Sequence, residues 1–274
     1  MNPPTPIHVI DLFHEERAGL LDLLSGLTPD EWDLPTVCPG WSLKDVALHI
    51  LGGDLGNLAR RRDGFLAGSR KLKEGESIVD LVNRINDQWV QTARWFSTRL
   101  IIDLLAVTGP QLFSYFATLD LSATSGGVSW AGLDRAPMWL DVAREYTERW
   151  LHQQHIRDAI GKPGLSNRRF LHPILATFVY ALPRAFRDTP APPGTAVHLQ
   201  ITGEAGGDWT LMRESPNWTL YTGAPSIPNA NVTLDQFTAW RLFTKGLTPA
   251  QAQVAIQGDP TLGSQVLQAV AIIA

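Results

Sequence analysis

Apolar residues recur at helical spacing through most of the chain up to Asp188. Between residues 8 and 24, leucine, isoleucine and phenylalanine return at this spacing until Gly26 ends the run. Similar runs predict helices over residues 77–97, 98–119, 137–160 and 166–187, the second of them interrupted near Gly109 and Pro110. Four long amphipathic helices with modest connections are typical of an antiparallel bundle.

Short polar motifs predict where two of the helical segments begin. Thr28 and Glu31 have the spacing of a capping box, and Ser42 and Asp45 repeat it with aspartate in place of the usual glutamate. Residues 35–41 between them contain two prolines and a glycine, so we interpret this stretch as a loop. A helix is therefore expected to start after Ser42.

The pattern changes after Asp188. Residues 189–194 are rich in proline and form the clearest linker in the sequence. Beyond them the pattern predicts short strands at 196–202, 209–212, 218–221 and 230–232, a helix over 233–245 capped by Thr233 and Gln236, and a last helix from Leu262 to the terminus. We therefore expect an α+β chain with a helical bundle at 1–165, a connecting helix at 166–188 and a C-terminal α+β domain at 189–274.

Composition narrows the classes of function. The chain has 274 residues, of which 44% are hydrophobic and 18% charged, so it can bury a sizeable core. A net charge of −4 offers no basic surface for nucleic acid and no polybasic patch for a membrane. The first residues indicate neither a signal peptide nor a spanning helix, and Cys38 is the only cysteine, which excludes an internal disulfide. We expect a soluble, cytoplasmic monomer that binds small molecules.

The helix predicted at 137–160 carries a pattern of metal ligands. Glu148 and His152 are four residues apart, so their side chains project from one face, and His155 follows one turn later. His49, in an apolar stretch of another helix, could complete an open three-ligand site. The alternatives are a solvated Glu–His pair and a core histidine whose nitrogens are satisfied. Glu145 is two turns from His152 and is a poorer co-ligand.

Several segments of the chain, two of them with specific motifs, resemble the mycothiol-dependent maleylpyruvate isomerase family, which belongs to the wider DinB/YfiT-like metalloenzymes. The first is a Cys-Pro-Gly-Trp loop that leads into a helix with a histidine. The second is Glu-x-x-x-His before an Ile-Arg-x-Ala-x-Gly end, and the C-terminal part is similar to the family's smaller domain. The stretches that carry the resemblance are 27–32, 38–50, 148–161, 239–246 and 258–259.

The resemblance implies a fold, a metal site and a cofactor. The fold would be a DinB-like antiparallel four-helix bundle followed by a smaller, sterol-carrier-like α+β domain. The metal ligands would be His49, Glu148 and His152, with zinc as the expected ion and one coordination position left open. The family often has aspartate where this chain has His155, so the role of that residue stays open. The cofactor would be mycothiol or another low-molecular-weight thiol.

Other residues are weaker candidates for the site. Arg84 could act as a catalytic residue that binds a substrate carboxylate, or it could lie on the surface. Trp41 and Trp150 are candidates for binding the cofactor by lining its pocket. Asp45, one turn before His49, could orient the imidazole, although N-terminal capping explains it as well. Cys38 lies just before a helix N-terminus, where thiols are often reactive, but packing in the loop is the simpler interpretation.

These features lead to three hypotheses. The first is a metal- and thiol-dependent isomerase or S-transferase, similar to maleylpyruvate isomerase, that acts on a small electrophilic or unsaturated substrate. The second is a non-catalytic protein that binds a small or apolar ligand on the same scaffold. The third is a metal-assisted hydrolase of thiol conjugates. A complete metal site would favour the enzymes over the binding protein, and none of these residues identifies the substrate.

Overall fold

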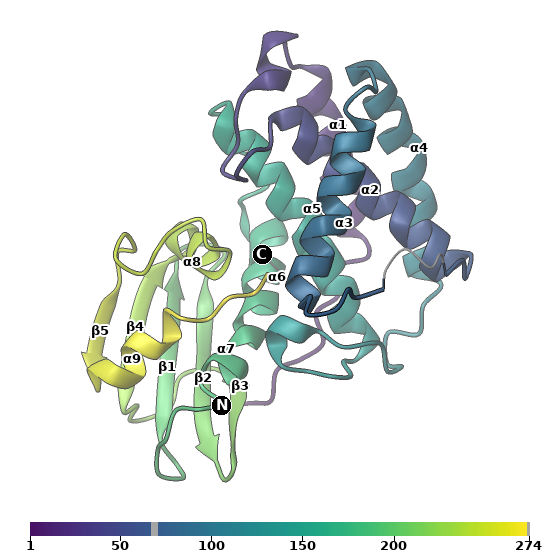
Figure 1. Ribbon diagram of the computed structural model, residues 1–274. Coiled ribbons are helices and arrows are strands. Elements are labelled where there is room, and N and C mark those ends of the chain that lie inside the picture. Colours follow the sequence, from purple (N-terminus) through teal and green to yellow (C-terminus); the bar gives the residue numbers. More distant parts are fainter. Residues whose placement is uncertain (67–70, 273–274) are drawn as a thin grey trace. The chain divides into compact units, whose positions relative to one another are not determined.

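The computed structural model describes residues 1–66 and 71–272 and has the expected α+β architecture (Figure 1). The chain divides into two compact units. The bundle unit contains residues 9–120 and 145–165, and the sheet unit contains residues 1–8, 121–144 and 166–272. Packing therefore groups residues 121–144 with the sheet, whereas sequence order alone places them with the bundle. The three-part division at residues 165 and 188 stays a prediction.

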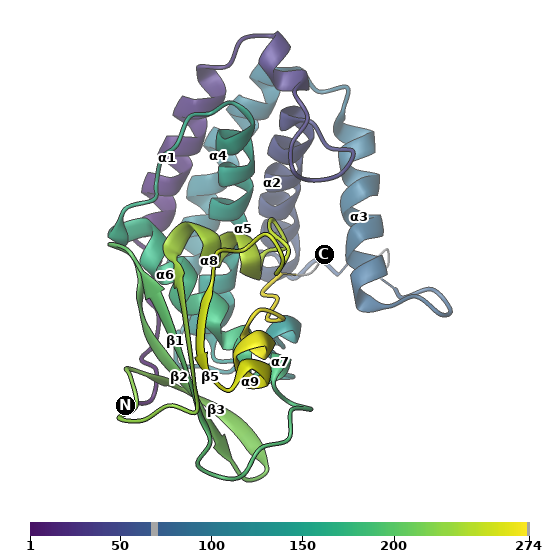
Figure 2. The ribbon, with the colours of Figure 1, turned by 90° about the vertical axis from the view of Figure 1, so that its left-hand side faces the viewer.

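Long helices build the bundle unit, as the apolar spacing predicts. Figure 2 shows α1, α4, α2 and α3 side by side; α4 packs against α1 and α2, and α2 also packs against α3. Residues 145–159 of α5 belong to the same unit. The helices are α1 (Leu12–Ser25), α2 (Leu43–Asn57), α3 (Ile78–Ala93), α4 (Thr98–Ala117) and α5 (Met138–Ala159). Their shared core includes Leu20, Leu24, Leu43, Leu48, Leu51, Ile101, Leu105 and Ile156.

Capping boxes start α2 and α3. The backbone N–H of Ser42 donates to Asp45 Oδ2 at 3.0 Å while the Ser42 hydroxyl accepts from the Asp45 backbone N–H, so the box expected there is confirmed. Ser77 and Asp80 form the same arrangement before α3. The Thr28 backbone N–H donates to Glu31 Oε2 at 2.7 Å, but this motif begins only a short 3₁₀ turn, Asp30–Asp33.

The helix α4 runs through Gly109 and Pro110, so the predicted interruption is wrong. Proline removes one intrahelical hydrogen bond, which explains why the sequence suggested a break. Arg17 lies against this turn of α4, where its Nη1 donates to the Leu105 carbonyl at 2.7 Å. By length and composition α4 could cross a membrane, and it is the one such helix in the described part of the chain. Core helices of soluble proteins meet the same criterion, and α4 packs on α1 and α2.

A mixed sheet forms the centre of the sheet unit. Its strand order is β3-β2-β1-β4-β5, with β1 and β4 parallel and the other neighbours antiparallel. The helices α8 and α9 pack on β1 and β4, where Val197, Leu199 and Val232 are buried. The strands are β1 (Ala196–Thr202), β2 (Gly207–Glu214), β3 (Asn217–Thr222), β4 (Ala230–Asp235) and β5 (Ala255–Gly258). The helices are α6 (Arg168–Phe178), α7 (Leu182–Ala185), α8 (Gln236–Phe243) and α9 (Pro260–Val266).

Several predicted boundaries in this unit are wrong. The helix expected at 166–187 is divided into α6, a 3₁₀ turn at Val179–Ala181 and α7. Thr233 continues β4, and Asp235 caps α8 instead by accepting from the backbone N–H groups of Phe237 and Thr238. The short edge strand β5 was not predicted. The last helix is the seven-residue α9, which ends at Val266; residues 273–274 of the predicted helix lie outside the described part of the chain.

Candidate metal centre

Three side chains predicted as metal ligands lie together in the bundle unit. His49 comes from α2, and Glu148 and His152 come from successive turns of α5. Their ligand atoms all lie within 4.8 Å of one another. The His49 and His152 rings are 4.4 Å apart between centroids, and His152 Nε2 lies 3.6 Å from Glu148 Oε2. We call these three residues the first ligand group.

Buried ion pairs fix the two helices that supply this group. Arg149, the residue after Glu148, uses Nη2 to donate to Asp54 Oδ1 on α2 at 3.0 Å and Nη1 to donate to Glu145 Oε2 at 2.9 Å. The side chain of Asn57 on α2 donates to the same Glu145 oxygen at 3.0 Å. These side chains are nearly inaccessible to solvent. The register of α2 against α5, and with it the placement of the ligands, therefore rests on charge-assisted hydrogen bonds.

The two histidines of the group differ in their electrostatic surroundings. Burial, assisted by the nearby His152, lowers the pKa of His49 to about 3, so this ring is neutral. Burial also opposes protonation of His152, but the neighbouring Cys38 and Glu148 outweigh it and raise its pKa to about 9. Without a metal ion, these neighbours favour the protonated ring, and a ring nitrogen must lose its proton when it binds a cation.

The residues present fit a divalent metal ion. Two imidazoles and a carboxylate are a donor set used by catalytic zinc sites, which keep a further position for water or substrate. Among the described residues, no group forms a hydrogen bond with the buried Nδ1 atom of His152. A buried nitrogen of this kind normally has a partner, because desolvation without one costs about 1–3 kcal/mol. The roles of His49, Glu148 and His152 as ligands stay a prediction that this geometry supports.

Cys38 and His155 lie next to the first ligand group. The sequence did not predict this position for Cys38. Cys38 Sγ is 3.2 Å from His155 Nδ1, within hydrogen-bonding distance for sulfur. The His152 and His155 rings are 5.3 Å apart between centroids. The helical spacing of His152 and His155 was visible in the sequence, but the loop conformation that brings Cys38 beside them was not.

The two tryptophans predicted to line a cofactor pocket have different surroundings. The Trp41 ring lies 5.1 Å from the His49 ring and packs at the edge of the bundle core. Trp150 is 1% exposed, and its indole N–H donates to the Leu165 carbonyl at 2.9 Å. Two residues after Glu148, Trp150 points to the opposite side of α5. The structure thus brings Trp41, and not Trp150, to the first ligand group.

Arg84 and Asp45 each form a bidentate ion pair. Arg84 donates from Nε and Nη2 to the two carboxylate oxygens of Glu76, at 2.6 and 2.8 Å, so its predicted role with a substrate carboxylate stays untested. Asp45 accepts from Arg94 Nε and Nη2 at 2.9 and 2.8 Å as well as capping α2. Burial raises the pKa of Asp45, but the hydrogen bonds from Arg94 and Ser42 outweigh it and lower the pKa overall. The predicted role of Asp45 in capping α2 is confirmed by its hydrogen bonds with Ser42.

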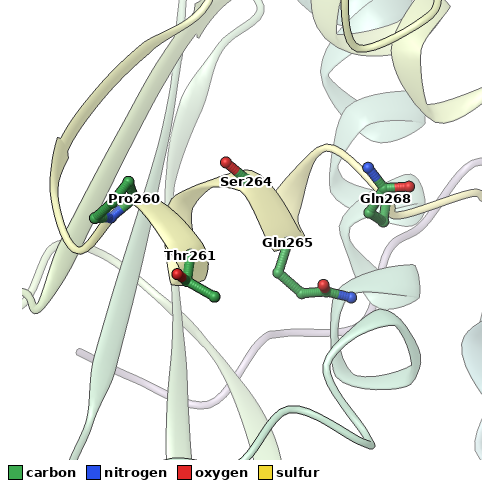
Figure 3. Close-up of a pocket in the computed structure, with 5 residues that line it drawn as sticks. All are labelled: Pro260, Thr261, Ser264, Gln265 and Gln268. Carbon is green, nitrogen blue, oxygen red and sulfur yellow. The ribbon is translucent and has the colours of Figure 1, made fainter.

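The sheet unit has a pocket of about 580 Å³ beside α9. Figure 3 shows Pro260, Thr261, Ser264 and Gln265 on this helix and Gln268 just after it. The Gln265 side chain donates to the Ala185 carbonyl at 2.6 Å. Hydroxyl and amide groups dominate the lining, so this pocket does not favour the apolar ligand that a sterol-carrier-like domain suggested.

Comparison with known proteins decides the family. The family model described as the mycothiol maleylpyruvate isomerase N-terminal domain matches residues 13–157, more than half of the chain. The chain belongs to this family. The matched segment contains every residue of the first ligand group as well as Cys38 and His155, so the family resemblance drawn from the Cys-Pro-Gly-Trp loop and the Glu-x-x-x-His motif is confirmed.

A solved structure supports the fold. A crystal structure of a mycothiol-dependent maleylpyruvate isomerase is similar with a TM-score of 0.54, at 12% sequence identity over 88% of this chain and 91% of that chain. A variant of such an isomerase with one histidine replaced by alanine has a TM-score of 0.48, at 14% identity over 85% of this chain and 86% of that chain. At 12% identity the likeness to the first of these structures shows a shared fold alone. No curated protein matches the chain.

Proposed function

We propose that the protein is a metal- and thiol-dependent enzyme, an isomerase or S-transferase similar to maleylpyruvate isomerase. Its substrate would be a small electrophilic or unsaturated molecule, and its thiol would be mycothiol or a related low-molecular-weight thiol. The ion, for which we propose zinc, would be held by His49, Glu148 and His152. The convergence of these three residues from two helices, in a chain that belongs to the family, is the observation that carries the proposal.

The three proposed ligands would contribute differently to binding a cation. When bound, the metal ion polarises a carbonyl or lowers the pKa of a coordinated thiol, and the thiol supplies a nucleophile that adds reversibly to a double bond. His49 is neutral and binds a cation without first losing a proton. Glu148 supplies the negative charge, and His152 releases its proton on binding. Three protein ligands leave room for a substrate or thiol atom.

Trp41 supports the proposal because it places an apolar surface beside the proposed ligands. Its ring contacts the neutral His49 ring, and it packs at the edge of the bundle core. An apolar surface next to a cation excludes water and strengthens electrostatic interactions inside the site. We also propose that the protein works in the cytoplasm, where low-molecular-weight thiols are kept reduced.

Metal content and thiol-dependent turnover test this proposal together. Elemental analysis of the untagged protein is expected to find about one divalent ion per chain, lost in His152→Ala and retained in the control His8→Ala, which alters an exposed histidine of the sheet unit. Proton NMR then follows maleylpyruvate and other unsaturated acids with mycothiol, with glutathione and with no thiol. We expect turnover only with a thiol and only in the metal-loaded protein.

The possible results separate the hypotheses. No ion in the wild type, even after reconstitution with zinc, nickel and manganese, contradicts the metal assignment. An ion without thiol-dependent turnover contradicts the isomerase or transferase activity. Hydrolysis of thiol conjugates by the metal-loaded protein, with no isomerisation, favours the hydrolase instead.

A further inference from the structure

Cys38 and His155 bring a second set of ligand atoms to His152. The ligand atoms of Cys38, His152 and His155 all lie within 4.8 Å of one another, and the closest pair, Cys38 Sγ and His155 Nδ1, is 3.2 Å apart. His155 is 9% exposed and lies one turn after His152 on α5, whereas Cys38 lies in the loop before α2. This second ligand group therefore shares one member with the first.

The spacing of the atoms suits a tetrahedral metal ion. In such a site, zinc–sulfur and zinc–nitrogen bonds place the sulfur and nitrogen ligands roughly 3.5 Å apart. The observed separation of 3.2 Å between Cys38 Sγ and His155 Nδ1 is close to that value. The third member, His152, has a buried Nδ1 atom that no described residue engages in a hydrogen bond, so the cluster contains unused ligating capacity.

We propose that Cys38, His152 and His155 form a second, thiolate-containing metal position beside the first ligand group. A thiolate with two imidazoles favours thiophilic cations such as Zn²⁺, Co²⁺ and Cd²⁺ over hard cations such as Mg²⁺. On binding, the sulfur–metal bond forms as the Cys38 thiol and any protonated imidazole release their protons to solvent. Since His152 belongs to both groups, the two positions compete, and one ion per chain moves between them. The inference does not depend on the proposed isomerase activity.

Cobalt absorption tests this position directly. Thiolate bound to Co²⁺ gives an intense near-ultraviolet charge-transfer band, and Cys38 is the only cysteine, so such a band in this protein reports one residue. The full chain is stripped of metal with a chelator and titrated with Co²⁺. We expect the band in the wild type and in His49→Ala, which removes the first ligand group and leaves the second intact. Cys38→Ser is expected to bind Co²⁺ without the band.

The variants also define what would overturn the inference. A wild type saturated with Co²⁺ but lacking the band excludes thiolate ligation. A band that disappears in His49→Ala assigns Cys38 to the first position and removes the second. The double variant His49→Ala/His155→Ala keeps Cys38 but only two ligands of the second group, so a band of unchanged strength there would exclude His155 as a ligand. Circular dichroism establishes that each variant is folded before titration.

Protection of the thiol gives a second measurement that does not depend on spectra. The thiolate is the reactive form of cysteine, so a metal ion that occupies it slows alkylation by iodoacetamide, by about tenfold or more when the site is saturated. We expect Zn²⁺ and Cd²⁺ to protect Cys38 in the wild type and in His49→Ala, and to lose this effect in His152→Ala. Equal alkylation rates with and without Cd²⁺ in the wild type would overturn the proposal.

Discussion

Arg17 and Asp54 form an ion pair inside the bundle unit, with Nη1 2.7 Å from Oδ2 and side chains that are 3% and 0% exposed. The other carboxylate oxygen accepts from Arg149 on α5 at 3.0 Å, so one aspartate contacts two guanidinium groups, and Arg149 is also paired with Glu145. Burial raises the pKa of Asp54, but the two arginines outweigh it and hold the carboxyl ionised. This arrangement joins α1, α2 and α5 at one point, and α2 and α5 supply the first ligand group.

Removal of the Asp54 carboxylate is expected to destabilise the protein strongly. Asp54→Ala leaves Arg17 buried without its counter-ion and Arg149 with Glu145 alone, and breaking a buried ion pair in this way costs about 3–5 kcal/mol of unfolding free energy. Thr108→Val is the matched control, because it removes only the hydroxyl that donates to Asp54 Oδ2 at 3.0 Å, for about 1 kcal/mol. Urea unfolding measures both, and equal losses in the two variants would contradict the role of the ion pairs.

Glu16 is expected to limit stability at neutral pH. Burial raises its pKa, although Arg17 and Arg149 oppose the shift, and no described residue forms a hydrogen bond with its Oε2 atom. A carboxyl whose pKa is raised in the folded state binds its proton more tightly there than in the unfolded chain. The folded protein therefore loses stability as the pH rises from the unfolded pKa of about 4.5 through the raised value.

The isosteric variant Glu16→Gln removes this titration while keeping an oxygen for the Gln153 side chain, which donates to Glu16 Oε1 at 2.8 Å. Its unfolding free energy is expected to equal that of the wild type near pH 4 and to exceed it increasingly toward pH 8. Glu15→Gln, at the exposed neighbouring position, is the control and should show no such trend. Denaturant unfolding at several pH values checks the sign, and a difference that shrinks toward pH 8 would contradict it.

Sequence patterns identified some residues of the candidate site and missed others. His49, Glu148 and His152 could be named because two of them share a helix face and the third lies in a recognisable family motif. The contact between Cys38 and His155 joins residues 117 positions apart through an irregular loop, and helical periodicity carries no information about such contacts. The buried charges at Arg17, Asp54 and Arg149 were missed for a similar reason. Their partners are distant in sequence, and hydrophobic patterning predicts charged residues on the surface.

The fold shows the same contrast. The helix start at Ser42 was predicted from its capping box because those hydrogen bonds are local, whereas the helix from residue 77 was predicted from apolar spacing and its capping box was not. Pro110 misled the prediction because the cost of a proline is visible in the sequence, whereas the packing of α4 on α1 and α2 is tertiary. The strand β5 has only four residues and pairs along the sheet edge with β4, so its burial pattern was too short to detect.

The Asp45–Arg94 pair is expected to make the start of α2 sensitive to acid. The pKa of Asp45 is lowered in the folded state, so its contribution to stability is fully present above the unfolded pKa of about 3.9 and is lost as pH falls through the folded value. Asp45→Asn is expected to lower the unfolding free energy at pH 7 by about 1 kcal/mol, the usual size of a lost cap.

A matched control for this prediction lies on α3. Asp80 occupies the same capping position after Ser77, but its carboxylate is exposed and its hydrogen bonds are to Ser77. Asp80→Asn should therefore lose less stability than Asp45→Asn. Thermal unfolding at pH 7 and pH 3 tests both variants. An Asp45→Asn deficit that persists undiminished at pH 3 would show that the ionised carboxylate is not its source.

Two adjacent glycines of α2 provide the sharpest test of how the His49 helix is packed. A Cβ atom at Gly52 would lie 2.5 Å from the Trp89 ring on α3, whereas at Gly53 no described atom outside the local helix backbone lies within 4 Å. The indole cannot easily move aside, because its Nε1 donates to the Leu48 carbonyl at 2.6 Å. Gly52→Ala is therefore expected to cost about 1–3 kcal/mol of unfolding free energy through overpacking.

Gly53→Ala should have the opposite effect. Alanine in the interior of a helix is favoured over glycine by about 0.8–1 kcal/mol, and at this position the methyl group meets no obstacle. Co²⁺ titration of both variants then reports on His49, which lies one turn before these positions. Because overpacking against Trp89 displaces α2, we expect weaker Co²⁺ binding in Gly52→Ala and unchanged binding in Gly53→Ala. Equal stability and equal Co²⁺ affinity in the two variants would contradict the close contact between α2 and α3.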